Sequence, residues 1–279
     1  MVSSVKVQRI EMANRISERM EHLRTTGGKS LSVVIMIGDP DIKTTFELVR
    51  IAVDIGVDVI ELGIPIDKPF LDSGIMRKSM SRALEFSRDH QLYLKTLGKL
   101  RAGFQDMPFE VMIYHDTVMD IGMDNFCKSL VDTGMDAVLV ADGFLKGNEF
   151  ICTLDEKLLN RGVVPIRFVS HPFNPQQIDD LQKNAHGFIV VQTKADHQGQ
   201  REALLDENRQ VLDEIRGAAI RLPLVLAYGI KTPMDVRKCI SLGADGVLIG
   251  TVVLEAAHRL TRTGFEDLLI NLRKATVSE

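Results

Sequence analysis

Residues 223–251, PLVLAYGIKTPMDVRKCISLGADGVLIGT, decide the fold. The stretch opens with the apolar run PLVLAY, continues with helical spacing between Thr232 and Leu242, and ends with a second apolar run, ADGVLIG. Short runs without polar alternation are typical of strands that are buried on both faces. Two such strands joined by a helix predict a β–α–β unit with parallel strands.

The same alternation recurs along the rest of the chain. Eight apolar runs are predicted to be strands: LSVVIMI, VDVIEL, FEVMIYH, DAVLVAD, VVPIRFVS, GFIVVQ, PLVLAY and ADGVLIG. Helical spacing is expected over 44–55, from 73 or 74 to 86, and over 91–103, 125–133, 148–160, 175–184, 201–218, 232–242 and from about 253 onward. Eight buried strands alternating with helices predict a (β/α)8 TIM barrel rather than an open doubly wound sheet.

Length and composition fit a globular protein with one core. The chain has 279 residues, of which 45% are hydrophobic and 26% are charged. A TIM barrel typically takes about 250 residues, so the length requires no second domain. We therefore expect a single domain over residues 1–279. Residues 1–30 are predicted to be a helical cap on the N-terminal end of the barrel, ended by Gly27 and Gly28.

The same inventory argues against several classes of protein. A net charge of -4 lacks the basic footprint of a nucleic-acid binder, and no apolar run approaches the roughly 20 residues that span a membrane. Cys127, Cys152 and Cys239 are odd in number and follow no secretory signal, which favours a reducing compartment and a cytoplasmic location. Because no HExxH or Cys/His set is present, we expect neither a metal nor a cofactor.

Two acidic residues mark the expected catalytic end of the barrel, where the strands have their C-terminal ends. Glu61 is the next-to-last residue of the run VDVIEL, and an unpartnered carboxylate is energetically costly in an otherwise apolar strand. Asp72 follows eleven positions later in a loop. Two carboxyl groups in different surroundings are suited to general acid and base catalysis. The structural alternatives are a Glu61 bonded to loop amides and an Asp72 that caps a helix.

Glycines after the last two strands predict an anion site. Tyr228-Gly229 and Gly250-Thr251 each precede helix-forming sequence, where backbone amides and the helix dipole favour phosphate. Gly199, after the sixth strand, is a further candidate for this cradle. The alternative is that these are ordinary turn glycines. Asp142, at the end of the fourth strand, is a candidate for ordering the site by hydrogen bonding.

Several motifs resemble the α subunit of tryptophan synthase between about residues 31 and 260. They are IGDPD, VDVIELGIPIDKPFLDSG, MIYHDTVMDIGMDNF, MDAVLVAD and AYGIKTPMDVRKCISLGADGVLIGT. The resemblance implies a barrel that cleaves indole-3-glycerol phosphate to indole and glyceraldehyde 3-phosphate in tryptophan biosynthesis. It also implies a β subunit as partner, in an α2β2-like complex that receives the indole.

The resemblance also implies roles for individual residues. It places Glu61 and Asp72 on the two catalytic carboxylates of the family, and Gly229, Gly250 and Thr251 on its phosphate-holding positions. Glu61 would be the acid and base at indole C3 and at the glyceryl hydroxyl, and Asp72 would accept a hydrogen bond from the indole N–H. The implied indole pocket includes Met112 and Tyr114, while Ile64 would limit water around Glu61.

Departures from the family pattern lie where substrate and partner are recognised. QTKADHQG keeps only Gly199 of the lid motif, and Lys68 stands where an acid is usual. His115-Asp116 replaces the usual asparagine, and Asp142-Gly143-Phe144 replaces a proline-containing docking loop. Two alternatives therefore stay open: a lyase or isomerase for another aryl or sugar phosphate, and a non-catalytic subunit that activates a β-like partner.

Overall fold

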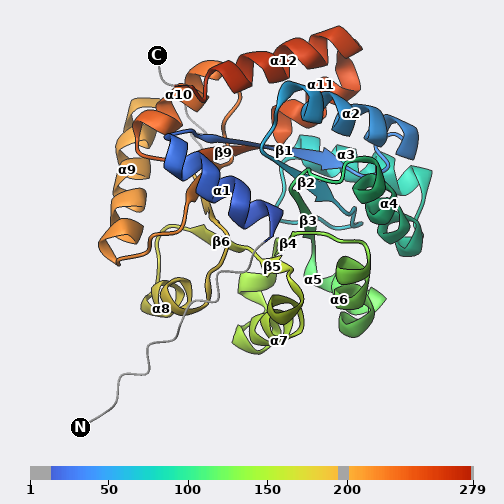
Figure 1. The fold of residues 1–279 in the computed structure, drawn as a ribbon, viewed down its shortest axis with the longest axis horizontal. Helices are drawn as coiled ribbons and strands as arrows, with labels where there is room; N and C mark the ends of the chain where they lie inside the picture. Colours follow the sequence, from blue (N-terminus) through green and yellow to red (C-terminus); the bar gives the residue numbers. More distant parts are fainter. Residues whose placement is uncertain (1–13, 194–200, 278–279) are drawn as a thin grey trace.

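Nine parallel strands form one sheet in the computed structural model, which describes residues 14–193 and 201–277. Their order in the sheet is β5-β4-β3-β2-β1-β9-β8-β7-β6 (Figure 1). The strands are β1 (Ser30–Met36), β2 (Val59–Gly63), β3 (Phe109–Ile113), β4 (Ala137–Val140), β5 (Val164–Pro165), β6 (Arg167–Ser170), β7 (Ile189–Gln192), β8 (Leu224–Ala227) and β9 (Gly246–Ile249).

The strands at the two ends of this order, β5 and β6, both come from one predicted strand. Strands β5 and β6 are separated only by Ile166, and the chain switches there from pairing with β4 to pairing with β7. The amides of Val164 and Ile166 donate toward β4, whereas Pro165 has no N–H to donate toward the other side. The sheet is thereby brought round onto itself. The eight predicted strands and the predicted barrel are confirmed, with VVPIRFVS split in two.

Helices surround the strands on the outside, except the first helix, which lies across one end of the strands (Figure 1). They are α1 (Arg15–Thr26), α2 (Ile42–Ile55), α3 (Gly74–Phe86), α4 (His90–Gly103), α5 (His115–Ile121), α6 (Met123–Asp132), α7 (Asn148–Leu158), α8 (Pro175–Asn184), α9 (Arg201–Gly217), α10 (Pro233–Ser241), α11 (Thr251–Arg259) and α12 (Arg262–Lys274), with 3-10 turns η1 (Gly143–Leu145) and η2 (Leu159–Arg161). Two differences from the prediction stand out. The run expected as strand through His115 ends at Ile113, and His115 begins α5 instead. The closing helix is the pair α11 and α12.

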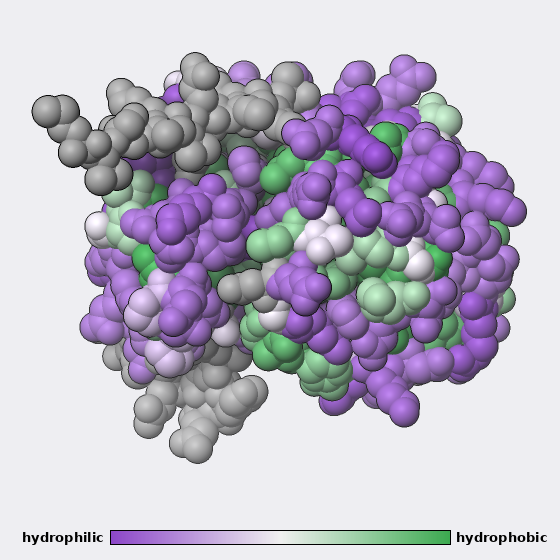
Figure 2. All heavy atoms as spheres, turned by 90° about the horizontal axis from the view of Figure 1, so that it is seen from below, coloured by the Kyte–Doolittle hydropathy of each residue, from purple (hydrophilic) through white to green (hydrophobic). Residues whose placement is uncertain are grey.

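Side chains alternate between the inside and the outside of the barrel. In β1, Val33 and Ile35 pack in the cluster that includes the helix residues of α2 and α4, so they face outward. Val34 and Met36 belong to the second cluster, which fills the interior. The side of the molecule drawn in Figure 2 is mostly hydrophilic with small hydrophobic patches, as expected where helices turn their polar faces to water.

Helix α1 covers the N-terminal ends of the strands, as the predicted cap requires. The Asn14 side chain accepts from the Ser17 amide and donates to the carbonyl oxygen of Asp136, 3.0 Å away, just before β4. The helix ends at Gly27, whose φ of 72° belongs to the left-handed region that favours glycine. The prediction of a helix ended by Gly27 is confirmed for the residues that the structure describes.

Three aspartates close this end of the barrel. Asp58, Asp136 and Asp245 each stand directly before a strand, namely β2, β4 and β9. Each carboxylate accepts a hydrogen bond from an amide at the start of the preceding strand. The donors are Leu31, Phe109 and Leu224, at 2.7, 2.8 and 2.9 Å.

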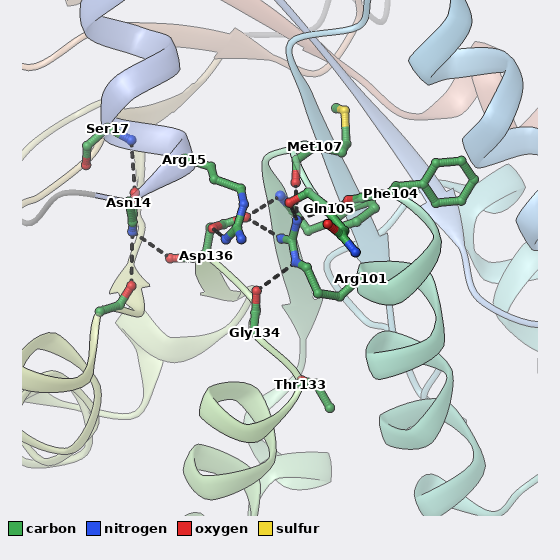
Figure 3. A network of polar contacts seen from close by, with 12 residues as sticks. Asn14, Arg15, Ser17, Arg101, Phe104, Gln105, Met107, Thr133, Gly134 and Asp136 are labelled. Atoms are coloured by element: carbon green, nitrogen blue, oxygen red, sulfur yellow. Dashed lines mark hydrogen bonds and ion pairs between the residues drawn. The ribbon is translucent and has the colours of Figure 1, made fainter.

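Each of these aspartates is also paired with cations. Asp136 binds Arg15 at 3.0 Å and Arg101 at 2.6 Å, and the Arg101 guanidinium further donates to four backbone carbonyl groups (Figure 3). Asp58 binds two arginines, and Asp245 binds an arginine and a lysine. The N-terminal end of the barrel is therefore a region of charges that are buried or half-buried and matched.

Candidate active site

A cavity opens at the C-terminal ends of the strands, inside the ring of loops. Strand ends supply its floor and walls, and the loops after β2, β8 and β9 supply its rim. It is lined by Val34, Glu61, Asp72, Ser73, Met76, Met112, Leu139, Ala141, Phe168, Val190, Ala227, Tyr228, Leu248, Gly250 and Thr251. This is the end of a TIM barrel at which active sites lie.

Glu61 projects into this cavity from β2. Residues 59, 61 and 63 share the inner face of the strand, whereas Ile60 and Leu62 pack outward. The side chain is buried, and its Oε2 has no hydrogen-bond partner among the described residues. Burial, and then the negative charge of Asp72, raise the pKa of Glu61 to about 8. Glu61 is therefore a protonated acid at neutral pH.

Asp72 has different surroundings. Its Oδ2 accepts a hydrogen bond from the Tyr114 hydroxyl over 2.6 Å. Burial raises the pKa of Asp72, while the Tyr114 hydrogen bond and the positive charge of Arg77 act in the opposite direction. Helix α3 is capped by Ser73, which accepts from the Met76 amide, so Asp72 is not that helix's N-cap. The two carboxyl groups thus meet at one cavity with unequal support for their ionised forms.

The rest of the cavity is apolar and aromatic. Met112, Leu139, Phe168 and other apolar side chains form its walls, and Tyr114 lies beside them in the same interior cluster. Ile64 lies elsewhere: it is buried in the outer cluster between strands and helices and is not among the lining residues. Ile64 faces outward, as Ile60 and Leu62 do in the alternation of β2, so the side chains that limit water around Glu61 are those of the inner cluster.

One corner of the cavity is built from backbone. Gly250 stands before α11, and among the described residues no side chain caps this helix, as is also the case for α5, α6 and α7. Thr251 follows, with its hydroxyl 3.4 Å from that of Ser73. A Cβ at Gly250 would lie 3.1 Å from Val34 and 3.2 Å from Met76, so the glycine allows a close approach. Uncapped helix N-termini suit anions.

Tyr228 and Gly229 form the other glycine-containing turn. Both have a positive φ, 74° for Tyr228 and 69° for Gly229. The conformation of Tyr228 is unusual for a non-glycine residue, and it is held by the Thr193 hydroxyl, which donates to the Tyr228 carbonyl over 2.5 Å. Tyr228 lines the cavity, whereas Gly229 serves the turn beside it. Gly199 lies outside the described residues.

Asp142 orders a neighbouring loop rather than the cavity wall. Its Oδ1 accepts from the His115 amide over 2.7 Å, and Lys146 lies 3.5 Å from its Oδ2. The side chain is buried and is not among the lining residues. It fixes the start of α5, directly after Tyr114, and this helix start had no recognised sequence signal.

The structure adds site residues that the sequence analysis did not name. Ser73, Met76 and Phe168 line the cavity, and Glu110 is buried in β3 beside Glu61. Glu110 had a sequence signal, since it is a charged residue inside the apolar run FEVMIYH. Over residues 14–193 and 201–277, no cluster of three or more potential metal ligands occurs. No described helix is long and apolar enough to cross a membrane.

Comparison with known proteins decides the family. A family model described as "Tryptophan synthase alpha chain" matches residues 20–276. The chain belongs to this family. The tryptophan synthase alpha chain of Citrifermentans bemidjiense is 30% identical over 249 residues, 87% of this chain and 88% of that protein. The one from Methanoregula boonei is 26% identical over 242 residues, 86% of this chain and 89% of the other.

A solved structure agrees with both fold and family. The crystal structure of tryptophan synthase subunit alpha from Legionella pneumophila str. Paris superposes with a TM-score of 0.83 at 26% identity, and covers 95% of this chain and 98% of that one. The predicted membership of the tryptophan synthase alpha chain family is confirmed. With it, the predicted role of the chain as a carbon–carbon lyase in tryptophan biosynthesis is confirmed as well.

Proposed function

We propose that this member of the tryptophan synthase alpha chain family cleaves indole-3-glycerol phosphate to indole and glyceraldehyde 3-phosphate with Glu61 and Asp72. The observation that carries the proposal is the cavity itself. It joins a buried Glu61, an Asp72 that accepts a hydrogen bond from Tyr114, and a helix N-terminus that no described side chain caps, around apolar walls. Apolar walls and an anion site suit the binding of an aromatic phosphate ester, and the two acids suit its cleavage.

The two acids divide the chemistry of the cleavage. The carbon–carbon bond breaks after indole C3 gains a proton, the glyceryl hydroxyl loses one, and the positive charge on the ring nitrogen is stabilised. Glu61 holds its proton at neutral pH because burial disfavours its charge, so it can donate to C3 and then take the hydroxyl proton. Asp72 accepts the hydrogen bond of the indole N–H and stabilises the cationic ring.

The phosphate is assigned to the corner at α11. No side chain in the described part of the chain caps the first amides of this helix, and Thr251 and Ser73 add hydroxyl donors there. Gly250 leaves room for an ester group to reach these amides. Met112, Leu139 and Phe168 offer the apolar surface for the indole ring. Tyr114, whose hydroxyl donates to Asp72, keeps that carboxyl group in place.

Two further parts of the function stay proposals. A tryptophan synthase β subunit is the proposed partner, in an α2β2-like complex, because the family typically acts with one. The cytoplasm is the proposed location, supported by three free cysteines, Cys127, Cys152 and Cys239, which suit a reducing compartment. We also propose that residues 1–279 form one domain.

An indole-release assay tests the activity. Purified protein with indole-3-glycerol phosphate is expected to release indole, and the assay is run with and without a β subunit. Absence of release in both conditions would contradict the proposal. If the chain releases no indole but stimulates a β subunit, it is a non-catalytic activator. If a different phosphate ester binds more tightly in a thermal-shift panel, the substrate assignment is wrong.

A further inference from the structure

Glu110 lies next to Glu61 inside the barrel. The two residues are paired in register on the adjacent parallel strands β2 and β3, and neighbouring strands are about 4.8 Å apart. Phe109 and Val111 pack in the outer cluster, and Met112 packs in the inner one. Because side chains alternate along β3, Glu110, which lies between Phe109 and Val111, faces the interior of the barrel. It is completely buried and does not line the cavity, so substrate bound there does not contact it.

No described residue supplies a counter-charge to this pair. In the described ranges, neither carboxyl oxygen of Glu110 has a hydrogen-bond partner, and no ion pair involves Glu61 or Glu110. Beside them in register stand Val34 on β1 and Ala137 on β4. Four other titratable groups lie around the described interior: Asp72 on the loop after β2, Tyr114 after β3, Tyr228 after β8, and Arg77 on α3, whose charge acts on Asp72.

Two unpaired acids in this position cannot both carry a charge. An isolated buried carboxylate is costly, and a second one on the adjacent strand adds repulsion. Burial, and then the charge of Glu61, raise the pKa of Glu110 well above its ordinary value. When Glu61 ionises during catalysis, Glu110 is therefore still a neutral carboxylic acid, which is a hydrogen-bond donor.

We propose that Glu110 is a positioning residue for the lyase reaction: a carboxylic acid that stays protonated and donates a hydrogen bond to the Glu61 carboxylate formed during turnover. The proposal rests on the proposed function of Glu61. The carboxylate of Asp136 is held by Arg101, whereas the carboxyl group of Glu110 has no hydrogen-bond partner among the described residues and stands in register with Glu61. A neutral carboxylic acid that donates a hydrogen bond in an apolar site is an established device of enzymes.

The protons balance over one cycle. Glu61 transfers its proton to indole C3 and becomes a carboxylate, which accepts the hydrogen bond from the Glu110 hydroxyl. The glyceryl O–H then gives its proton to Glu61 while its bonding electrons form the aldehyde C=O. The electron pair of the broken carbon–carbon bond returns to the indole ring. Glu110 keeps its own proton throughout, so Glu61 ends the cycle as the acid with which it began.

Two variants distinguish a hydrogen-bonding role of Glu110 from a packing role. Glu110→Gln keeps an N–H donor of similar size, and Glu110→Met keeps the volume without a donor. In the indole-release assay we expect kcat to fall about 10-fold or more in Glu110→Met, with KM unchanged. We expect Glu110→Gln to retain kcat within about 3-fold by the same reasoning. The apparent pKa of Glu61 in the pH profile of kcat should rise in Glu110→Met, because its carboxylate has lost a donor.

A second measurement does not depend on activity. Infrared difference spectra of the whole protein at neutral pH should contain the carbonyl stretch of a protonated, buried carboxylic acid, and Glu110→Gln should remove part of it. Glu61→Gln is the matched control and should remove a separate part. A wild-type kcat and pH profile in a folded Glu110→Met would overturn the proposal, as would an infrared band unaffected by Glu110→Gln. Failure of the wild type to release indole would contradict the proposed function instead, and the infrared result would still decide the protonation of Glu110.

Discussion

The two ends of the barrel differ in the surroundings of their buried acids. At the N-terminal end, Asp136 has two arginines and a backbone amide around its carboxylate. At the C-terminal end, no described cation pairs with Glu61 or Glu110, and Asp72 accepts a hydrogen bond from the Tyr114 hydroxyl over 2.6 Å. Matched charges hold a fixed structure, whereas a buried acid without a cation, such as Glu61, keeps its proton near neutral pH and can donate it.

The comparison also separates stability from chemistry. Removing one partner of a buried ion pair leaves an uncompensated charge, so the N-terminal end should respond to mutation with a loss of stability. Removing an unpaired buried acid relieves a cost, so the C-terminal end should lose activity while the fold persists. The following experiments test this division, from the largest expected effect to the smallest.

Glu61→Gln should have the largest effect. Loss of a general acid and base lowers turnover by about 10²- to 10⁴-fold, and we expect kcat for indole release to fall within that range. The circular dichroism spectrum should be unchanged, because the neutral amide resembles the protonated acid. Glu47→Gln, an exposed residue 3.9 Å from Lys43, is the control and should leave kcat unchanged. Undiminished turnover by Glu61→Gln would remove the assigned role.

Asp136→Asn tests the opposite end. The substitution leaves Arg101, a mostly buried side chain, without its carboxylate partner, and we expect a loss of about 3 kcal/mol in the free energy of unfolding. Urea denaturation measures this loss, and the kcat of the folded fraction should stay at the wild-type value.

Asp132→Asn is the matched control for that experiment. Asp132 pairs with Lys128 on the surface, where both side chains are more than half exposed, and such pairs contribute little. The unfolding midpoint should therefore hardly move. Equal losses in Asp136→Asn and Asp132→Asn would mean that the aspartates at the N-terminal end do not have the structural role assigned to them.

Gly250→Asp tests the anion corner. A carboxylate placed before α11 would repel a phosphate, and we expect KM to rise at least about 10-fold. Gly250→Ala is the control for size. Its Cβ would lie 3.1 to 3.2 Å from Val34 and the flexible Met76, so a smaller increase in KM is expected. If the aspartate variant binds substrate as well as the alanine variant does, the phosphate lies elsewhere.

Tyr114→Phe should have a moderate effect. It removes the hydroxyl that donates to Asp72, and a hydrogen bond to a charged group is worth about 10-fold in rate. Because this bond lowers the pKa of Asp72, its loss should raise that pKa and move the acidic limb of the kcat profile to higher pH. A 10-fold loss without any movement of that limb would mean that Tyr114 acts through packing alone.

The pH dependence of the wild-type kcat is expected to be the smallest of these effects near neutral pH. Glu61 acts from its protonated form, and its pKa is raised to about 8, so kcat should fall as the pH increases through this value. We expect about half the maximal rate at that pH and about a tenth one unit higher. Circular dichroism over the same range checks that the protein stays folded. A flat profile would show that Glu61 is not the titrating acid.

Most strands and helices of the barrel could be predicted from the local pattern of apolar residues. The site could be predicted only in part. The eight apolar runs coincide with strands because a strand buried on both faces needs no alternation to be recognised. The split of the predicted strand VVPIRFVS at Pro165 and Ile166 could not be predicted, because it depends on the neighbouring strands with which each half pairs. Helix α5 was missed because its start depends on the bond from the His115 amide to Asp142, 27 residues away.

The same contrast holds for the site residues. Glu61, Asp72 and Gly250 could be named from their places at strand ends, and Ile64 was assigned to the same pocket by adjacency in sequence. Ile64 faces outward because it continues the alternation of β2, and the walls come instead from inward-facing residues of strands far apart in the chain. The sixth loop, with Gly199, lies outside the described residues, and its role stays a prediction.

The amino-acid sequence by itself determined the order of strands and helices, the family and the two acids of the site, because periodicity and motif are local properties of the chain. Only the tertiary structure decided which acids are matched by cations and which are not. Glu110 shows the reason: its protonation depends on burial and on Glu61, and the two residues are 49 positions apart in sequence yet side by side in the sheet.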